Sequence, residues 1–281
     1  MSAVIMDGKK LAKQTKDGIA AQIKQSNKKL GLGTILVGDD PGSLAYVEGK
    51  HSDCAEVGIN SIRVKLPKTA SEQEIIKAVN DLNNNPDCTG FIVQLPLPKS
   101  VNTEKVLLAI DPKKDADGLN PVNLGSLVLS ANKVIPCTPK AILTLLNEYK
   151  IKLSGSKVLI IGRGTTVGRP LSILLSQKPI DATITLAHSA TNNLMDLIKE
   201  ADVVVAAIGV AHFIKPNMVK PGCTVVDVGI TREDGKLLGD VDPAVAQVAA
   251  YFTPTPGGVG PMTIVSLLMN TLKAAKKEVY S

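Results

Sequence analysis

A chain of 281 residues is long enough for two domains. Of its residues, 44% are hydrophobic but only 2% are aromatic, so the core must be aliphatic, as in buried parallel strands covered by helices. The net charge of +6 comes from scattered Lys and Arg with few aromatic side chains to stack on bases, which argues against nucleic-acid binding and favours small anionic ligands. The longest apolar stretches are too short to cross a membrane, so we expect a soluble, cytoplasmic protein without a membrane partner.

The first half of the chain alternates helices with strands, which predicts a parallel sheet covered by helices. We expect Ser43 to cap the second helix and Gly58 to end it, and Ser71 with Glu74 to form a capping box on the third. The expected elements are helices over 8–30, 44–58, from 72 onward and near 102–110, and strands over 33–38, 59–66 and 88–95.

The segment from Pro136 to Pro139 marks a crossing into a second α/β region, which ends in a turn-dense stretch. Pro261 is expected at the first position of a terminal helix that runs to about residue 278 and returns to the first domain. Here we expect helices over 139–149, after 170 and over 191–199, with strands over 158–161, 182–187, 202–208, 223–228 and 251–253. The predicted architecture is two α/β domains around a cleft, one of residues 1–137 plus 262–281 and a Rossmann-type one of residues 138–261.

A glycine-rich turn lies between a buried strand and a helix in the second region. Gly162, Gly164 and Gly168 give the spacing G-x-G-x-x-x-G, one residue longer than the common dinucleotide-binding fingerprint. Glycines let the backbone approach a pyrophosphate, and the following helix offers free N–H groups and a positive dipole end. The alternative is an ordinary strand-to-helix turn that needs glycine for its backbone angles.

The residues after the next strand indicate which dinucleotide would bind. An NAD site places an acidic residue there, but this strand is followed by His188 and Ser189, and Asp181 lies at its other end. Arg163 and Ser189 are suited to a 2′-phosphate, which a carboxylate would repel. We therefore expect NADP, with solvated loop residues as the alternative.

The catalytic candidates come from the first region. Tyr46 and Lys50 are four residues apart on one helix face, and this helix follows strand 33–38. Gln94 ends strand 88–95, and carboxyl ends of parallel strands share one edge, so we expect Lys50 and Gln94 to converge. Burial there would lower the pKa of a lysine and suit it to proton transfer. The alternatives are a solvated lysine, a packing tyrosine and a glutamine that caps the strand end.

No metal site is expected. The three histidines lack ligand spacing, and the four cysteines form no C-x-x-C pair, so they are expected in the core of a protein from a reducing compartment. The cysteines are Cys54, Cys88, Cys137 and Cys223.

Eight motifs in order carry a resemblance to a known family. They are SLAYVEGK (43–50), FIVQLPLP (91–98), KDADGLNPVNLG (114–125), PCTPKAIL (136–143), GRGTTVGRP (162–170), VVDVGI (225–230), GDVD (239–242) and PTPGGVGPMT (254–263). Through them the chain resembles the bifunctional methylenetetrahydrofolate dehydrogenase/cyclohydrolases along essentially its whole length. The resemblance implies oxidation of methylenetetrahydrofolate by NADP⁺, then hydrolysis of the methenyl product to 10-formyltetrahydrofolate. The alternatives are a dehydrogenase without the second step and a silent nucleotide-binding scaffold.

The same resemblance implies roles for individual residues. It makes Lys50 the catalytic residue of hydrolysis, Gln94 the residue that tunes it, Tyr46 a packing surface for folate, and Asp117 the partner of the pterin ring. Without the family, Asp117 would be interpreted as a turn residue before Gly118. The implied folate-binding residues are Tyr46, Lys50, Gln94, Leu95, Pro96, Asp117, Pro256, Gly257, Gly258 and Val259. The implied cofactor-binding residues are Gly162, Arg163, Gly164, Thr165, Val167, Gly168, His188, Ser189, Ile208, Gly209 and Ile230.

Two positions depart from the family pattern. Gly164 stands where the family usually has serine, which removes a hydroxyl near the cofactor phosphates, and Thr255 stands where it more often has valine. The resemblance also implies a homodimer paired through the nucleotide domain. With no appended synthetase domain, we do not expect formyltetrahydrofolate to be made from formate.

Overall fold

The computed structural model describes residues 2–131 and 134–276, and the chain divides into two compact units that we describe separately. The six-stranded unit comprises residues 1–13 and 138–263, and the three-stranded unit comprises residues 14–137 and 264–281. The boundaries expected from the sequence instead assign residues 1–13 and 262–263 to the three-stranded unit. A two-residue strand, β1 (Val4–Ile5), pairs with the sheet of the six-stranded unit, and so short a strand has no sequence signal.

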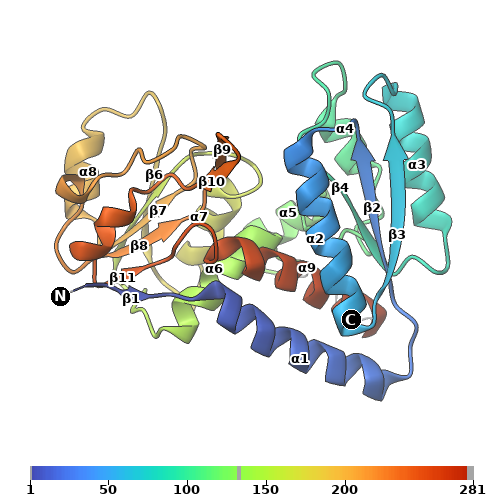
Figure 1. Cartoon of the computed structure of the whole chain (residues 1–281), viewed down its shortest axis with the longest axis horizontal. Coiled ribbons are helices and arrows are strands. Elements are labelled where there is room, and N and C mark those ends of the chain that lie inside the picture. Colours follow the sequence, from blue (N-terminus) through green and yellow to red (C-terminus); the bar gives the residue numbers. More distant parts are fainter. Residues whose placement is uncertain (1, 132–133, 277–281) are drawn as a thin grey trace. The chain divides into compact units, whose positions relative to one another are not determined.

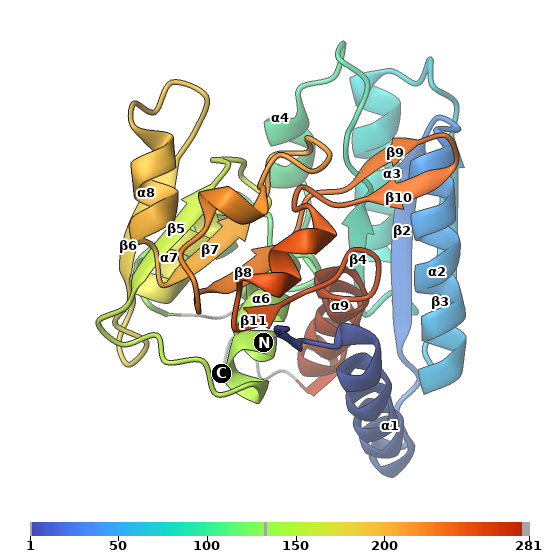
Figure 2. The same ribbon diagram turned by 60° about the vertical axis from the view of Figure 1, so that its left-hand side comes forward.

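The six-stranded unit is built on a parallel sheet with strand order β1-β11-β8-β7-β5-β6 (Figures 1 and 2). Its central strands are runs of Val, Leu, Ile and Ala that are buried after the exposed Lys157, as the sequence predicted. The strands after β1 are β5 (Lys157–Ile161), β6 (Thr183–Ala187), β7 (Val203–Ala206), β8 (Thr224–Asp227) and β11 (Tyr251–Phe252).

Helices and a hairpin complete the six-stranded unit. The helices are α6 (Cys137–Glu148), α7 (Gly168–Ser176), α8 (Leu194–Glu200) and the 3₁₀ turns η1 (Pro216–Met218) and η2 (Pro243–Gln247). The hairpin pairs β9 (Thr231–Glu233) with β10 (Lys236–Leu238). It was not predicted, because its strands are only three residues long and contain no buried residue, although its Asp234–Gly235 turn has the positive φ angles typical of tight hairpins.

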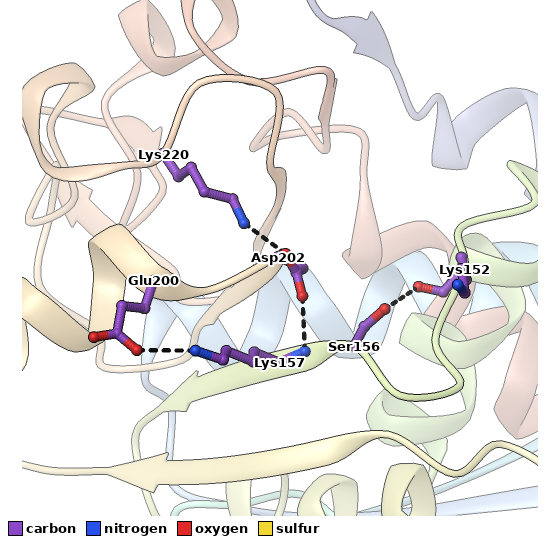
Figure 3. Close-up of polar contacts among 6 residues, drawn as sticks. All are labelled: Lys152, Ser156, Lys157, Glu200, Asp202 and Lys220. Atoms are coloured by element: carbon purple, nitrogen blue, oxygen red, sulfur yellow. Dashed lines mark hydrogen bonds and ion pairs between the residues drawn. The ribbon is translucent and has the colours of Figure 1, made fainter.

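Ion pairs hold the amino-terminal edge of this sheet (Figure 3). The Asp202 carboxylate accepts a 2.9 Å hydrogen bond from the Lys157 backbone and a 2.5 Å bond from Lys220 Nζ, and Lys157 Nζ pairs with Glu200 at 3.0 Å. The hydrogen bond from Lys220 lowers the pKa of Asp202. All four side chains are at least 40% exposed, so each pair contributes at most about 1 kcal/mol. The neighbouring Ser156 hydroxyl donates to the Lys152 carbonyl at 2.8 Å. The turns that follow β5, β6, β7 and β8 lie at the opposite, carboxyl-terminal edge of the sheet.

The three-stranded unit has a parallel sheet with strand order β3-β2-β4, in agreement with the predicted alternation. Its core packs Ile75 and Val79 from a covering helix against Ile35 and Phe91 from the sheet. The strands are β2 (Gly31–Val37), β3 (Asn60–Leu66) and β4 (Gly90–Val93). The helices are α1 (Gly8–Ser26), α2 (Pro41–Val57), α3 (Glu72–Asn84), α4 (Thr103–Leu108), α5 (Pro121–Val128) and α9 (Val259–Lys276).

The terminal helix α9 returns to the three-stranded unit, as predicted. It begins within the six-stranded unit and continues into the other from Ile264 onward, where Asn270 Nδ2 donates to the carbonyls of Ala116 and Ile135 at 3.0 and 3.2 Å. The predicted end near residue 278 lies outside the described residues. No helix in the described part of the chain is long and apolar enough to cross a membrane.

Several helix ends follow their sequence signals and others do not. The Ser71 capping box and the left-handed Gly58 cap of α2 are both present. The prediction of Ser43 as the cap of α2 was wrong: Asp40 is the cap, and its carboxylate accepts hydrogen bonds from the backbone and hydroxyl of Ser43. The helix therefore begins earlier, at a proline. Pro261 likewise falls at the third position of α9, where its missing N–H is still tolerated within the first turn.

Candidate active site

Lys50 and Gln94 meet at the carboxyl-terminal edge of the three-stranded sheet. Helix α2, which carries Lys50, follows β2, and Gln94 follows the adjacent parallel strand β4. Lys50 Nζ donates a 2.9 Å hydrogen bond to Gln94 Oε1, and the Lys50 side chain is only 5% exposed. The predicted convergence of these two residues is therefore observed.

The neighbours of Lys50 hold its amine in one place. Gln94 Nε2 donates to the Leu95 carbonyl at 2.8 Å, which turns the amide oxygen toward Lys50. The ring of the half-buried Tyr46, one helical turn away, lies 4.4 Å from Lys50 Nζ at its centroid, a contact that is a cation–π interaction when the amine is protonated. Burial also raises the pKa of the Tyr46 hydroxyl, so this ring stays neutral.

Burial lowers the pKa of Lys50, although the negative charge of Asp117 acts in the opposite direction. The side chain is therefore easier to deprotonate than an exposed lysine. A neutral amine that is fixed by one hydrogen bond has a free lone pair for accepting a proton.

Asp117 lies on a loop that Asp115 organises. The buried Asp115 carboxylate accepts hydrogen bonds from the backbone of Gly118 (3.0 Å) and Asn120 (2.8 Å) and from Asn123 Nδ2 (2.8 Å). Gly118 has φ +78°, and a Cβ there would lie 2.8 Å from the Pro136 nitrogen, so the turn requires glycine.

The organised loop leaves Asp117 as the second polar group of the site. Burial raises its pKa, and the positive charge of Lys50 and a hydrogen bond from the Cys137 thiol oppose this rise. Asp117 is half-buried, and its carboxylate is not one of the groups that hold the loop together. It can therefore bind an N–H-rich ligand, whereas the turn-forming role belongs to Asp115, which the sequence interpretation did not single out.

Asp115→Ala should lower the free energy of unfolding by about 3 kcal/mol, because it leaves three donors around the carboxylate unpaired. Urea unfolding followed by circular dichroism measures this change. The control is Asp81→Ala, which removes an exposed carboxylate paired with Lys77 on α3 and should cost less than about 1 kcal/mol. Equal losses in the two variants would contradict the organising role of Asp115.

Two of the three loop glycines in the six-stranded unit are required by the backbone. Gly162 has φ +113°, and its Cβ would lie 2.1 Å from the Ala207 carbonyl oxygen. A Cβ on Gly168 would lie 1.8 Å from the Gly162 carbonyl oxygen. Gly164 is different: its nearest neighbour would be a side-chain oxygen at 3.9 Å, and its φ is not in the left-handed region. The departure at Gly164 is therefore not imposed by the fold.

This turn fits a dinucleotide. Helix α7 begins directly after it without a side-chain hydrogen bond to its first N–H groups, so its amino terminus is available to a phosphate. The predicted cofactor residues Arg163, Gly164 and Thr165 are exposed on the turn, Val167 is the residue before the helix, and Gly168 is its first residue.

The remaining predicted cofactor residues follow the neighbouring strands. His188 and Ser189 follow β6, Ile208 and Gly209 follow β7, and Ile230 follows β8. Because β8, β7, β5 and β6 are adjacent and parallel, all these residues lie along one edge of the sheet with the glycine turn.

The turn after β6 contains no carboxylate. His188 closes this turn, because its backbone N–H donates to Thr191 Oγ1 at 2.8 Å and its Nδ1 faces the Ala190 N–H at 3.2 Å. Ser189 is exposed beside it. The turn can therefore accept a 2′-phosphate without repulsion.

The turn from Pro256 to Val259, predicted to bind substrate, belongs to the six-stranded unit, whereas Tyr46, Lys50, Gln94, Leu95, Pro96 and Asp117 belong to the other. Gly257 has φ +112°, and a Cβ on Gly258 would lie 2.7 Å from the Pro254 carbonyl oxygen, so both glycines are needed for this turn. Among the described residues, no group of His, Cys, Asp or Glu side chains could hold a metal ion. All four cysteines are buried and none forms a disulfide, in line with their expected place in the core.

Two family models together match most of the chain. Residues 6–117 match the tetrahydrofolate dehydrogenase/cyclohydrolase catalytic domain, and residues 136–279 match the NAD(P)-binding domain of the same enzymes. The chain belongs to the tetrahydrofolate dehydrogenase/cyclohydrolase family. The predicted family and the two-domain α/β fold are therefore confirmed, and the Lys50 and glycine-turn sites lie in the catalytic and NAD(P)-binding domains of this family respectively.

Solved structures of the family cover nearly the whole chain. The bifunctional FolD enzyme of Campylobacter jejuni is 39% identical over 99% of this chain and 100% of that one, with a TM-score of 0.93. The Trypanosoma brucei enzyme, solved with NADP cofactor and inhibitor, is 35% identical over 100% of both chains, with a TM-score of 0.94. The bifunctional enzyme of Thermoplasma acidophilum is 30% identical over 98% of this chain and 99% of that one, with a TM-score of 0.90.

Proposed function

We propose that Lys50 carries the cyclohydrolase step of this family member and that the glycine-turn edge holds its NADP. The chain is a bifunctional enzyme: it oxidises 5,10-methylenetetrahydrofolate with NADP⁺ and hydrolyses the 5,10-methenyl product to 10-formyltetrahydrofolate. The observation that carries the assignment of Lys50 is its buried amine, held by Gln94 within the catalytic domain.

The hydrolytic step needs a group that removes a proton from water. As water adds to the methenyl carbon, the neutral Lys50 amine accepts one of its protons and a hydroxyl adduct forms. The C–N5 bond then breaks as N5 gains a proton and the hydroxyl loses its own, which leaves the formyl group on N10 and releases one proton overall. Burial favours the neutral amine, and Gln94 keeps its lone pair in one direction. Asp117 supports this step by accepting hydrogen bonds from the pterin N–H groups, and Tyr46, Leu95 and Pro96 form the apolar surface around the folate.

The oxidative step needs alignment rather than an acid or base. Bound NADP⁺ accepts the hydride. The chain's own part is to bind the pyrophosphate at the glycine turn and the α7 amino terminus, the 2′-phosphate at Arg163 and Ser189, and the nicotinamide half near Ile208, Gly209 and Ile230. The turn Pro256–Val259 is assigned to the folate.

The coupled reaction tests the assignment. With 5,10-methylenetetrahydrofolate and NADP⁺, absorbance at the NADPH band should rise, and 10-formyltetrahydrofolate should form faster than in buffer alone. Methenyltetrahydrofolate that accumulates and decays at the buffer rate would show a dehydrogenase without the second activity.

Arg163→Ala should raise the KM for NADP⁺ about tenfold, the effect of one lost hydrogen bond to a charged group, and leave the KM for NAD⁺ unchanged. Steady-state kinetics with both cofactors measures the two values. The control is Arg232→Ala, which removes an exposed arginine from strand β9 and should change neither KM value. If the two KM values rise together, Arg163 does not contact the 2′-phosphate.

We also propose a cytoplasmic homodimer. The four buried cysteines without disulfides support a reducing compartment, and the family resemblance supports pairing through the nucleotide-binding domain. Sedimentation equilibrium of the purified protein tests the dimer, and a mass of one chain would contradict it.

A further inference from the structure

Asp240 is a fully buried carboxylate that no step above uses. Its Oδ2 accepts hydrogen bonds from the backbone N–H groups of Ile208 (2.5 Å) and Gly209 (3.1 Å), and its Oδ1 accepts one from Val210 (2.9 Å). Three successive backbone N–H groups thus point at one carboxyl group, an arrangement that holds a loop in a single conformation.

A second buried carboxylate holds Asp240. Asp227 Oδ1 accepts the Asp240 backbone N–H at 2.8 Å, and the Asp227 backbone in turn donates to Thr253 Oγ1 at 2.7 Å. The Thr255 hydroxyl also bonds the Asp227 carboxylate. Burial raises the pKa of Asp227 to about 7, and the bond from Thr255 opposes this rise by favouring the charged form.

Two glycines leave the space that these carboxylates occupy. A Cβ on Gly229 would lie 2.0 Å from Asp240 Oδ2, and a Cβ on Gly239 would lie 1.6 Å from Asp227 Oδ2. Glycine is therefore required at both positions to leave room for the two carboxylates. The segment 208–210, which Asp240 holds, directly follows Ala207, and the carbonyl of Ala207 lies against Gly162 of the glycine turn.

We propose that Asp240 is a positioning residue for the NADP site, which fixes the backbone of residues 208–210, and that Asp227 with Thr255 keeps Asp240 in place. This inference rests on the proposed NADP site, because Ile208 and Gly209 are assigned there. The side chains of Ile208 and Val210 are 36% and 48% exposed at this edge, so the segment presents a fixed apolar surface. Asp240 itself is 0% exposed and acts through that backbone.

Asp240→Asn tests the proposal with little change of shape. An asparagine has one side-chain oxygen, so it cannot replace both Oδ1 and Oδ2 of Asp240 as hydrogen-bond acceptors. Its NH₂ group must then face at least one backbone N–H of the segment. Titration calorimetry at pH 8, where Asp227 is ionised, should show the Kd for NADP⁺ raised about tenfold. Cyclohydrolase activity, assayed with methenyltetrahydrofolate and no nucleotide, should stay at the wild-type level and so report an intact catalytic domain.

A second pair of variants decides the question if Asp240→Asn does not fold. Thr255→Val removes only the hydroxyl that bonds Asp227 and should weaken NADP⁺ binding about threefold, whereas Thr255→Ser keeps the hydroxyl and should restore it. A Kd within about twofold of wild type for a folded Asp240→Asn, or equal Kd values for the two Thr255 variants, would overturn the positioning role. Failure of the wild-type protein to bind NADP⁺ would instead overturn the proposed NADP site.

Discussion

Replacement of Lys50 by methionine is expected to lower the kcat of methenyltetrahydrofolate hydrolysis by about 10²- to 10⁴-fold, the usual contribution of a positioned general base. Methionine keeps an unbranched chain in the buried position, so the apolar packing around α2 should survive. The amine that Gln94 orients is lost, and no other described lysine shares that hydrogen bond. Loss of the methenyl absorbance, corrected for the rate in buffer, measures the effect.

The matched control is Lys77→Met on α3, where the side chain is 76% exposed and paired with Asp81. It should leave hydrolysis unchanged. Calorimetry should give the same Kd for NADP⁺ in wild type and in Lys50→Met, because the glycine turn is untouched. Hydrolysis that continues at the wild-type rate without Lys50 would remove it from the mechanism.

The pH profile adds a second check on Lys50. A general base acts in its neutral form, so the enzymatic rate should rise with pH through the pKa of this amine. Burial places that pKa below the ordinary value of 10.5, and the rise should therefore be centred below 10.5. The same rise should be absent from Lys50→Met, and a rise of equal size in that variant would assign it to another group.

Gly168→Ala is expected to abolish measurable NADP⁺ binding and with it the dehydrogenase activity. The new Cβ would lie 1.8 Å from the Gly162 carbonyl oxygen, so either the turn or the start of α7 must move. Movement of either destroys the approach of the backbone to the pyrophosphate, and the strain costs on the order of several kcal/mol. Calorimetry with NADP⁺ measures binding, and thermal unfolding measures the strain.

Gly164→Ala is the control in the same turn. Its Cβ meets no atom closer than 3.9 Å, and its backbone angles suit any residue, so binding and stability should match wild type. Cyclohydrolase activity should persist in both variants and show that the catalytic domain is folded. If the two alanine variants bind NADP⁺ equally well, the close approach at Gly168 is not what the site requires.

Most elements could be predicted because their signals are local. The Ser71 capping box, the Gly58 cap and the runs of β-branched residues each act within a few residues, and the structure has all of them. The two-residue strand β1 and the hairpin β9–β10 carry no such signal, since strands this short are defined only by the partner that accepts them. The cap of α2 is Asp40 and not Ser43. Both residue types fit the role, and Pro41, which is favoured at the first helical position, selects Asp40.

The residues of the candidate site also fall into those that the sequence could predict and those that it could not. Lys50 and Gln94 could be paired in advance because each follows a parallel strand, and the carboxyl ends of adjacent parallel strands meet. Asp115 and Asp240 could not be assigned, although both lie in motifs that carried the family resemblance. The donors that bind Asp240 lie 30 to 32 residues away along the chain.

The amino-acid sequence alone therefore determined the alternation of the longer strands and helices, the glycine turn, the absence of an acid after β6 and the family, because these depend on residue type and short spacing. Only the tertiary structure decided which glycine of the turn is dispensable, because that depends on the atoms a Cβ would meet. It also decided that Asp115 organises the loop and leaves Asp117 available, and that Asp227 and Asp240 brace the 208–210 segment. A buried carboxylate has no characteristic neighbours in sequence, and its role follows from the donors that the fold brings to it.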